Sequence, residues 1–153
     1  MTYSDTSYSD ALPDPDRHSA FYSGTAIKRG VAWIIDTVII VALAVIILPF
    51  TAFTALFFWP LFYVCLGFLY RWATLSNRSA TWGMRLMSVS FRDRTGQPFD
   101  AGTAFVHTAL YTLCISSILP QLLSIGAMLM TRRGQSLPDL VIGSVCLNRA
   151  ARM

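Results

Sequence analysis

The chain has 153 residues, of which 54% are hydrophobic and 13% are charged, and its mean hydropathy is +0.52. Soluble domains carry about 25% charged residues, so the composition excludes an ordinary soluble protein, and the length predicts one domain. The net charge is +4, but the first 23 residues carry four Asp and one Arg, which leaves eleven basic and four acidic residues for the remainder. Because those basic residues flank apolar runs, they indicate membrane topology and contacts with anionic lipid headgroups, and they exclude a nucleic-acid surface.

Residues 1–20 are polar and contain Ser, Asp, Tyr and two prolines. Such a segment cannot bury enough apolar surface to fold, so we predict a disordered tail. It also lacks the basic-then-apolar layout of a signal peptide, and we expect the first spanning helix to be its own targeting signal.

The first predicted membrane helix covers about residues 27–48. Its 22 residues are apolar apart from Lys28, Arg29, Asp36 and Thr37, and about 20 apolar residues are enough to cross a bilayer. The basic pair at its start predicts that this end is cytoplasmic. A second apolar run, about 53–72, completes an antiparallel hairpin with both outer ends inside, and Pro60 predicts a kink in it.

The middle region, 74–100, is rich in arginine and is therefore expected in the cytoplasm. Met87–Arg92 alternates strictly between apolar and polar residues, which is the periodicity of a strand. We predict a brief helix to about Leu86, followed by this short strand.

Residues 101–131 contain His107 as their only ionisable group. At about 46 Å, one straight helix is too long for an untilted crossing, whereas two full crossings need about 40 residues. We predict a second hairpin of helices at about 101–117 and 121–131, the latter short, with Arg132 and Arg133 marking a return to the cytoplasm. A single tilted third helix, with the C-terminus outside, is the alternative.

The segment Leu137–Leu147 is too short to span. Val141–Leu147 is rich in branched residues and is expected to pair with the Met87–Phe91 strand, and residues 149–153 form a basic tail. The predicted fold is an all-α polytopic membrane protein with four membrane-embedded helices in two hairpins, and with a short cytoplasmic strand pair.

Three charged residues are the main candidates for a site: Arg29, Asp36 and Asp139. A carboxylate inside a spanning helix costs about 2.5–3.5 kcal/mol, so Asp36 either binds a proton or small cation or forms a structural polar contact. Arg29 is either a headgroup anchor or the partner of Asp139, since its planar fork suits a carboxylate. Asp139 is equally suited to be the N-cap or a first-turn acid of a short helix after Pro138.

Other candidates are weaker. His107 has the pKa range for proton relay but no acid near it in sequence, so packing is the simpler interpretation. Cys65, Cys114 and Cys146 lie in apolar surroundings without metal spacing and are expected to be small buried hydrophobes. No nucleophile–base set, phosphate loop, metal site or cofactor site is indicated, so we expect no enzyme. The secondary candidates for a polar network are Thr37, His107, Arg132 and Arg133.

The charged residues stand in segments that resemble the RDD family of small bacterial membrane proteins, named for one arginine and two aspartates. Arg29 and Asp36 in KRGVAWIIDTVII are similar to the family's opening, and SATWGMRL is similar to its Thr-x-Gly-Lys-Arg segment. RRGQSLPDLVIGS is similar to the closing Arg…Leu-His-Asp-Leu-x-Ala-Gly-Thr. The resemblance covers about residues 22–148, and the matched motif positions include Thr81, Gly83 and Gly143.

Four residues depart from the family's pattern. Met84 stands at a usual lysine and Pro138 at a usual histidine, while Ile142–Ser144 replaces Ala-Gly-Thr. The resemblance implies a multi-pass protein of the bacterial cytoplasmic (inner) membrane with a cytoplasmic N-terminus, and proposed transport, including cation–proton exchange. We therefore carry two hypotheses: a small, oligomeric transporter or cation/proton exchanger that uses Asp36, or a membrane scaffold or accessory subunit in which the three charges hold the fold.

Overall fold

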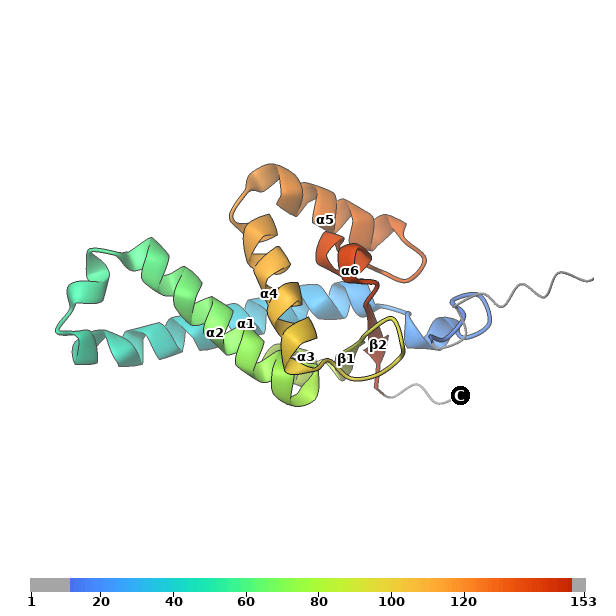
Figure 1. The fold of residues 1–153 in the computed structure, drawn as a ribbon, viewed down its shortest axis with the longest axis horizontal. Coiled ribbons are helices and arrows are strands. Elements are labelled where there is room, and N and C mark those ends of the chain that lie inside the picture. The colour runs from blue at the N-terminus through green and yellow to red at the C-terminus, as the bar shows by residue number, and fades with distance from the viewer. Residues whose placement is uncertain (1–11, 150–153) are drawn as a thin grey trace, which may run out of the picture.

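The computed structural model describes residues 12–149 of the chain. Six α-helices and two strands follow one another, and a helical hairpin projects from a more compact part in which the remaining elements gather (Figure 1). The elements are α1 (Thr25–Ile47), α2 (Trp59–Arg78), α3 (Trp82–Leu86), β1 (Val89–Arg92), α4 (Ala101–Ile115), α5 (Ile118–Met130), α6 (Leu137–Ile142) and β2 (Val145–Asn148), with short 3-10 turns at Ser19–Phe21, Leu48–Thr51 and Thr54–Leu56.

Among the described residues, one helical stretch is long and apolar enough by itself to cross a membrane. It runs from Ser19 to Thr51 through α1, and only 22% of its most apolar window is buried, which is unlike the core helix of a soluble protein. α4 and α5 pass the same test only together, because their 15 and 13 residues extend about 22 and 20 Å, less than a bilayer core of about 30 Å. The structure therefore shows one clear apolar span, and it does not confirm four membrane-embedded helices.

The second helix begins later than the sequence predicted. Ala52 and Phe53 take positive φ angles and end the first helical stretch, and α2 starts only at Trp59. Pro60 lies in the first turn of α2, where its missing N–H is one of the groups without a partner in any helix. The predicted kink at Pro60 is therefore wrong, since this proline starts the helix.

The predicted helix–break–helix in residues 101–131 is confirmed. α4 ends at Ile115, α5 begins at Ile118, and the two helices meet at an angle of 117°. This bend excludes one straight, tilted third helix.

The small sheet is also confirmed, with a later start of its second strand. β1 and β2 are antiparallel, with Ser90 opposite Leu147 and Arg92 opposite Val145. Val141, which was expected in the strand, belongs instead to α6.

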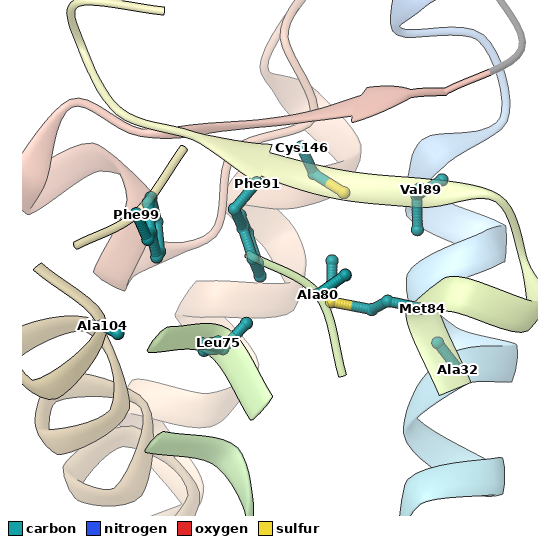
Figure 2. Close-up of a cluster of buried hydrophobic side chains, with 9 residues drawn as sticks. All are labelled: Ala32, Leu75, Ala80, Met84, Val89, Phe91, Phe99, Ala104 and Cys146. Carbon is teal, nitrogen blue, oxygen red and sulfur yellow. The ribbon is translucent and has the colours of Figure 1, made fainter. Parts of the chain in front are cut away.

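The buried apolar core lies where the sheet meets α1, α2, α3 and α4 (Figure 2). Elsewhere the usual arrangement is inverted, because the interior is rich in polar side chains while large apolar side chains cover the outer faces of α1, α2, α4 and α5. Exposed apolar surface on this scale marks a surface that contacts a membrane or another protein. The core residues are Ala32, Leu75, Ala80, Met84, Val89, Phe91, Phe99, Ala104 and Cys146.

Residues 1–11 of the tail that was predicted to be disordered lie outside the described residues, as do 150–153 of the basic tail. Residues 12–20, which the disorder prediction also included, follow a defined path. Leu12 packs in a cluster with Phe21, Tyr22 and β2, and the Tyr22 hydroxyl donates to the Pro13 carbonyl at 2.7 Å. For these residues the structure differs from the prediction, because the strand offers them an apolar surface.

Gly83 gives a direct test of how α3 docks on α1. A Cβ at this position would lie 2.2 Å from the Ala32 carbonyl oxygen, whereas a Cβ at Gly126 would meet nothing within 4 Å. We expect Gly83→Ala to destabilise the protein by about 1–3 kcal/mol or more through overpacking. Thermal unfolding of purified protein in detergent measures this; equal stability of Gly83→Ala and Gly126→Ala would contradict the close docking.

Candidate functional site

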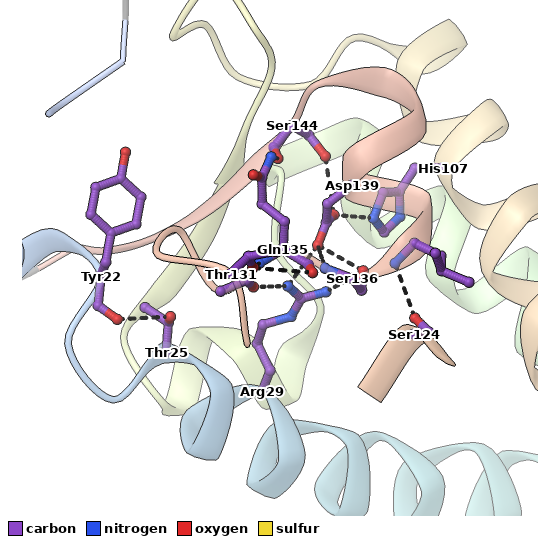
Figure 3. Close-up of polar contacts among 12 residues, drawn as sticks. Tyr22, Thr25, Arg29, His107, Ser124, Thr131, Gln135, Ser136, Asp139 and Ser144 are labelled. Carbon is purple, nitrogen blue, oxygen red and sulfur yellow. Dashed lines mark hydrogen bonds and ion pairs between the residues drawn. The ribbon is translucent and has the colours of Figure 1, made fainter. Parts of the chain in front are cut away.

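The first polar cluster is built on an ion pair between α1 and α6. Arg29 Nη1 lies 2.6 Å from Asp139 Oδ2, and the two side chains are 13% and 0% exposed. The same guanidinium donates to the Gly134 carbonyl and to the Ser136 hydroxyl, each at 3.0 Å (Figure 3). Of the two interpretations left open by the sequence, the structure thus shows the pairing with Asp139.

Asp139 is surrounded by donors from several segments. His107 Nε2 lies 2.9 Å from Oδ1, to which the Ser144 hydroxyl also donates at 3.0 Å. The backbone N–H and hydroxyl of Ser136 donate to Oδ2 at 3.0 and 2.7 Å. Burial by itself opposes ionisation, but the attraction of Arg29 and the hydrogen bonds from His107 and Ser136 outweigh it and hold the pKa of Asp139 well below its ordinary value.

Local sequence explains why Asp139 is placed there. Ser136 caps α6, and Ser136 and Asp139 exchange hydrogen bonds as a capping box, with Pro138 in the first turn. Gly143 ends the helix with φ +74°, a conformation that glycine adopts without strain, and it turns Ser144 back toward Asp139. Asp139 is therefore both the first-turn acid of α6 and the ion-pair partner of Arg29.

The second polar cluster surrounds Asp36 and joins α1 to α2 and α3. The Tyr70 hydroxyl and the Gly83 N–H donate to Oδ1 at 2.7 and 2.8 Å, and the Thr81 hydroxyl donates to Oδ2 at 2.6 Å. Thr81 is also the N-cap of α3, accepting from the N–H of Met84 at 3.2 Å. A buried carboxylate here stabilises the unpaired N–H groups at the start of α3.

The two clusters are separate. Arg29 and Asp36 lie two turns apart on α1, about 10 Å along its axis, and no ion pair joins them within residues 12–149. The structure brings Arg29 and Asp139 together and places Asp36 in contact with uncharged donors.

A cavity of about 420 Å³ lies between the clusters. Arg29, His107 and Ser136 contribute from one cluster and Asp36 from the other, while Arg71 and Tyr111 lie in the wall formed by α2 and α4. Much of the remaining wall is apolar and comes from α1 and α5. The cavity has the size and mixed lining of a small-molecule site.

Other sequence candidates lie outside this network. The Thr37 hydroxyl donates to the Trp33 carbonyl of its own helix, and Arg132 pairs with Asp16 at 2.8 Å on the exposed surface. Arg133 makes no ion pair with another described residue. His107, in contrast, has an acid beside it in space, and its Nδ1 atom is buried without a hydrogen-bond partner in the described part of the chain.

The cysteines differ from one another. Cys146 is buried in the core, where burial raises the pKa of its thiol to about 12, so it behaves as a small hydrophobe. Cys114 is half-buried and Cys65 is exposed, so the expectation of a buried side chain is wrong for Cys65, which lies on the apolar outer surface of α2. Within residues 12–149, no three His, Cys, Asp or Glu side chains come together as a metal site.

Sequence reasoning missed four residues of the site: Tyr70, Arg71, Ser136 and Ser144. For Tyr70 and Arg71, nothing in the local sequence shows that they face α1 and α4. Ser136 was detectable, since Ser-x-x-Asp before an apolar run is the pattern of a capping box.

Comparison with known proteins gives one match. Residues 23–143, most of the chain, match the model of the RDD family. No curated protein and no solved structure matches the chain.

Asp139→Asn tests the buried pair. Because the change leaves the Arg29 charge without its partner, we expect a loss of about 3–5 kcal/mol in the free energy of unfolding. Asp16→Asn is a matched control, since its pair with Arg132 is exposed and is worth about 0–1 kcal/mol. Denaturation in detergent measures the free energy of unfolding of both variants. Similar losses would contradict a larger contribution of the buried pair than of the exposed pair.

The lowered pKa of Asp139 also predicts how stability depends on pH. A carboxyl group whose pKa is lower in the folded state stabilises the fold at pH values above its unfolded-state pKa, which is near 3.8. This stabilisation is lost as the pH falls toward the folded-state pKa. The stability difference between wild type and Asp139→Asn should therefore be constant from pH 5 upward and shrink below about pH 4. Unfolding midpoints measured across this range check the sign; a difference that grows on acidification would contradict it.

Proposed function

The chain belongs to the RDD family, and on this basis we propose that it is an integral membrane protein with a scaffold or accessory role. In this proposal the charged residues hold a cap, formed by α3, α6, β1 and β2, on the membrane hairpin of α1 and α2. Arg29 and Asp36 attach the cap at two points of one helix.

One observation supports this proposal best: both buried carboxylates already have donors as partners. Asp36 accepts from Tyr70, Thr81 and Gly83, and its exposed fraction is 1%. Asp139 is fully buried and neutralised by Arg29. Binding of a cation needs several free oxygen ligands, which donors such as N–H groups cannot supply. The arrangement favours a carboxylate with fixed partners over one that exchanges its partner.

The exposed apolar surface of α1, α2, α4 and α5 and the family membership support a membrane location. The proposal places the protein in the bacterial inner membrane as a multi-pass protein, with the N-terminus and the arginine-rich cap in the cytoplasm, in agreement with the positive-inside rule. Its partners are anionic lipids and, as an accessory subunit, another copy or another membrane protein. We assign no enzymatic activity.

The second candidate is cation/proton exchange at Asp36. It is favoured by one feature, since the cavity reaches Asp36 and also His107. Exchange would require Thr81 and Gly83 to release the carboxylate, and therefore α3 to move. Because the described helices are few for an enclosed path, this candidate also requires an oligomer.

A gradient assay separates the candidates. We expect proteoliposomes of the wild type to retain an imposed pH or sodium gradient as well as protein-free liposomes do. Asp36→Asn, which puts an amide N–H group among donors, should lower the unfolding midpoint and the amount of protein in membranes, because a buried polar mismatch costs about 1–3 kcal/mol. Thr37→Val is a control on the same helix.

The opposite result is equally clear. If the wild type dissipates the gradient and Asp36→Asn stops this without reducing the amount or stability of the protein, exchange replaces the scaffold role.

A further inference from the structure

The cavity contains a basic group that neither polar cluster uses. Arg71, on α2, is half-buried in the cavity wall, and its guanidinium carbon lies 4.0 Å from the centre of the Tyr111 ring. Trp33 Nε1 donates to the Tyr111 hydroxyl at 2.8 Å, which holds the ring in place. The ion pairs within residues 12–149 all involve other cations, so in this part of the chain no carboxylate neutralises Arg71.

The charges around the cavity favour an anion. Its wall carries two guanidinium groups, Arg29 and Arg71, and one carboxylate, Asp36. Asp139, which neutralises Arg29, is 0% exposed and is not part of the wall. Asp36 is also nearly inaccessible and has three donors directed at it. Asp139 thus compensates Arg29, whereas no carboxylate of residues 12–149 pairs with Arg71, and the Tyr111 ring holds Arg71 without cancelling its charge.

The other part of the wall is apolar and reaches the outer surface. α5 contributes Ile125, Met128 and Leu129, which follow one another on a single helical face, and α1 contributes Ile27. Ile27 and Leu129 are 74% and 68% exposed, so the apolar side of the cavity continues into the surface that lipid would cover. A ligand that fits both parts has an anionic group and an apolar tail.

We propose that the cavity binds the anionic headgroup of a membrane phospholipid. A phosphate oxygen binds Arg71, and an acyl chain packs along Ile27 and Leu129. The planar guanidinium suits two-point binding of phosphate. This proposal rests on the proposed membrane location, and it holds for a scaffold and for an exchanger alike.

The experiment titrates purified full-length protein in neutral detergent with phosphatidylglycerol and measures binding by native mass spectrometry and by the unfolding midpoint. Phosphatidylcholine and inorganic phosphate are the comparison arms. We expect phosphatidylglycerol to bind and to raise the midpoint, with weaker binding of phosphatidylcholine and none of inorganic phosphate. Equal binding of the two lipids, or binding of inorganic phosphate that displaces phosphatidylglycerol, would overturn the proposal.

Two variants locate the site. Arg71→Gln should reduce the affinity for phosphatidylglycerol by about tenfold or more, the usual effect of losing a charged hydrogen bond. Arg78→Gln, an exposed arginine on the same helix, should change it less than about twofold, within the range of surface substitutions. Equal losses in the two variants would mean non-specific charge attraction and contradict the assignment of Arg71.

A cavity-filling variant tests the same site if Arg71→Gln does not fold. Gly30 lines the cavity, and a Cβ there would meet nothing within 4 Å, so Gly30→Leu fills the space without removing a polar contact. It should weaken binding of phosphatidylglycerol while the unfolding midpoint without lipid is kept. Gly126→Leu, at a glycine of α5 that is outside the cavity wall, is the control. Unchanged binding to Gly30→Leu would exclude the cavity as the site.

Discussion

The ion pair of Arg29 with Asp139 is the interaction on which the arrangement of the compact part depends. An arginine and a carboxylate taken out of water lose several kcal/mol of hydration each, and their attraction compensates only when the remaining donors and acceptors are satisfied. Here Gly134, Ser136 and Ser144 supply those partners, so the loop before α6, the helix itself and the start of β2 must all take one position. The pair thus fixes the end of the chain against the beginning of α1.

The second anchor, at Asp36, does the same for the middle of the chain. Its carboxylate binds the N-terminal end of α3, and Gly83 allows the backbone of α3 to approach that of α1 closely. Both anchors join a membrane helix to a short helix that is too small to be stable alone.

The cavity is a consequence of these anchors. They hold α1 at two levels, while the sharp bend between α4 and α5 turns α5 away from the direction of α4 (Figure 1). The space left between the helices keeps Arg71 and His107 in its wall. This cavity, with a basic group in its wall and an apolar side that continues into the outer surface, is the feature of this fold that favours binding of a ligand.

Sequence by itself determined the elements whose signals are local. The length and hydropathy of the first helix, the alternation before β1 and the polar break near Ser116 each reflect a period or a composition that one segment carries, and all three appear in the structure. The family's three charged positions were also recognisable. Tertiary structure decided which of them meet: Arg29 reaches Asp139, whereas Asp36 binds Tyr70, Thr81 and Gly83. It also decided that His107 has an acid beside it and that Arg71 faces a cavity. These contacts join residues 32 to 110 positions apart, and no local period encodes them; they follow only from how the helices pack.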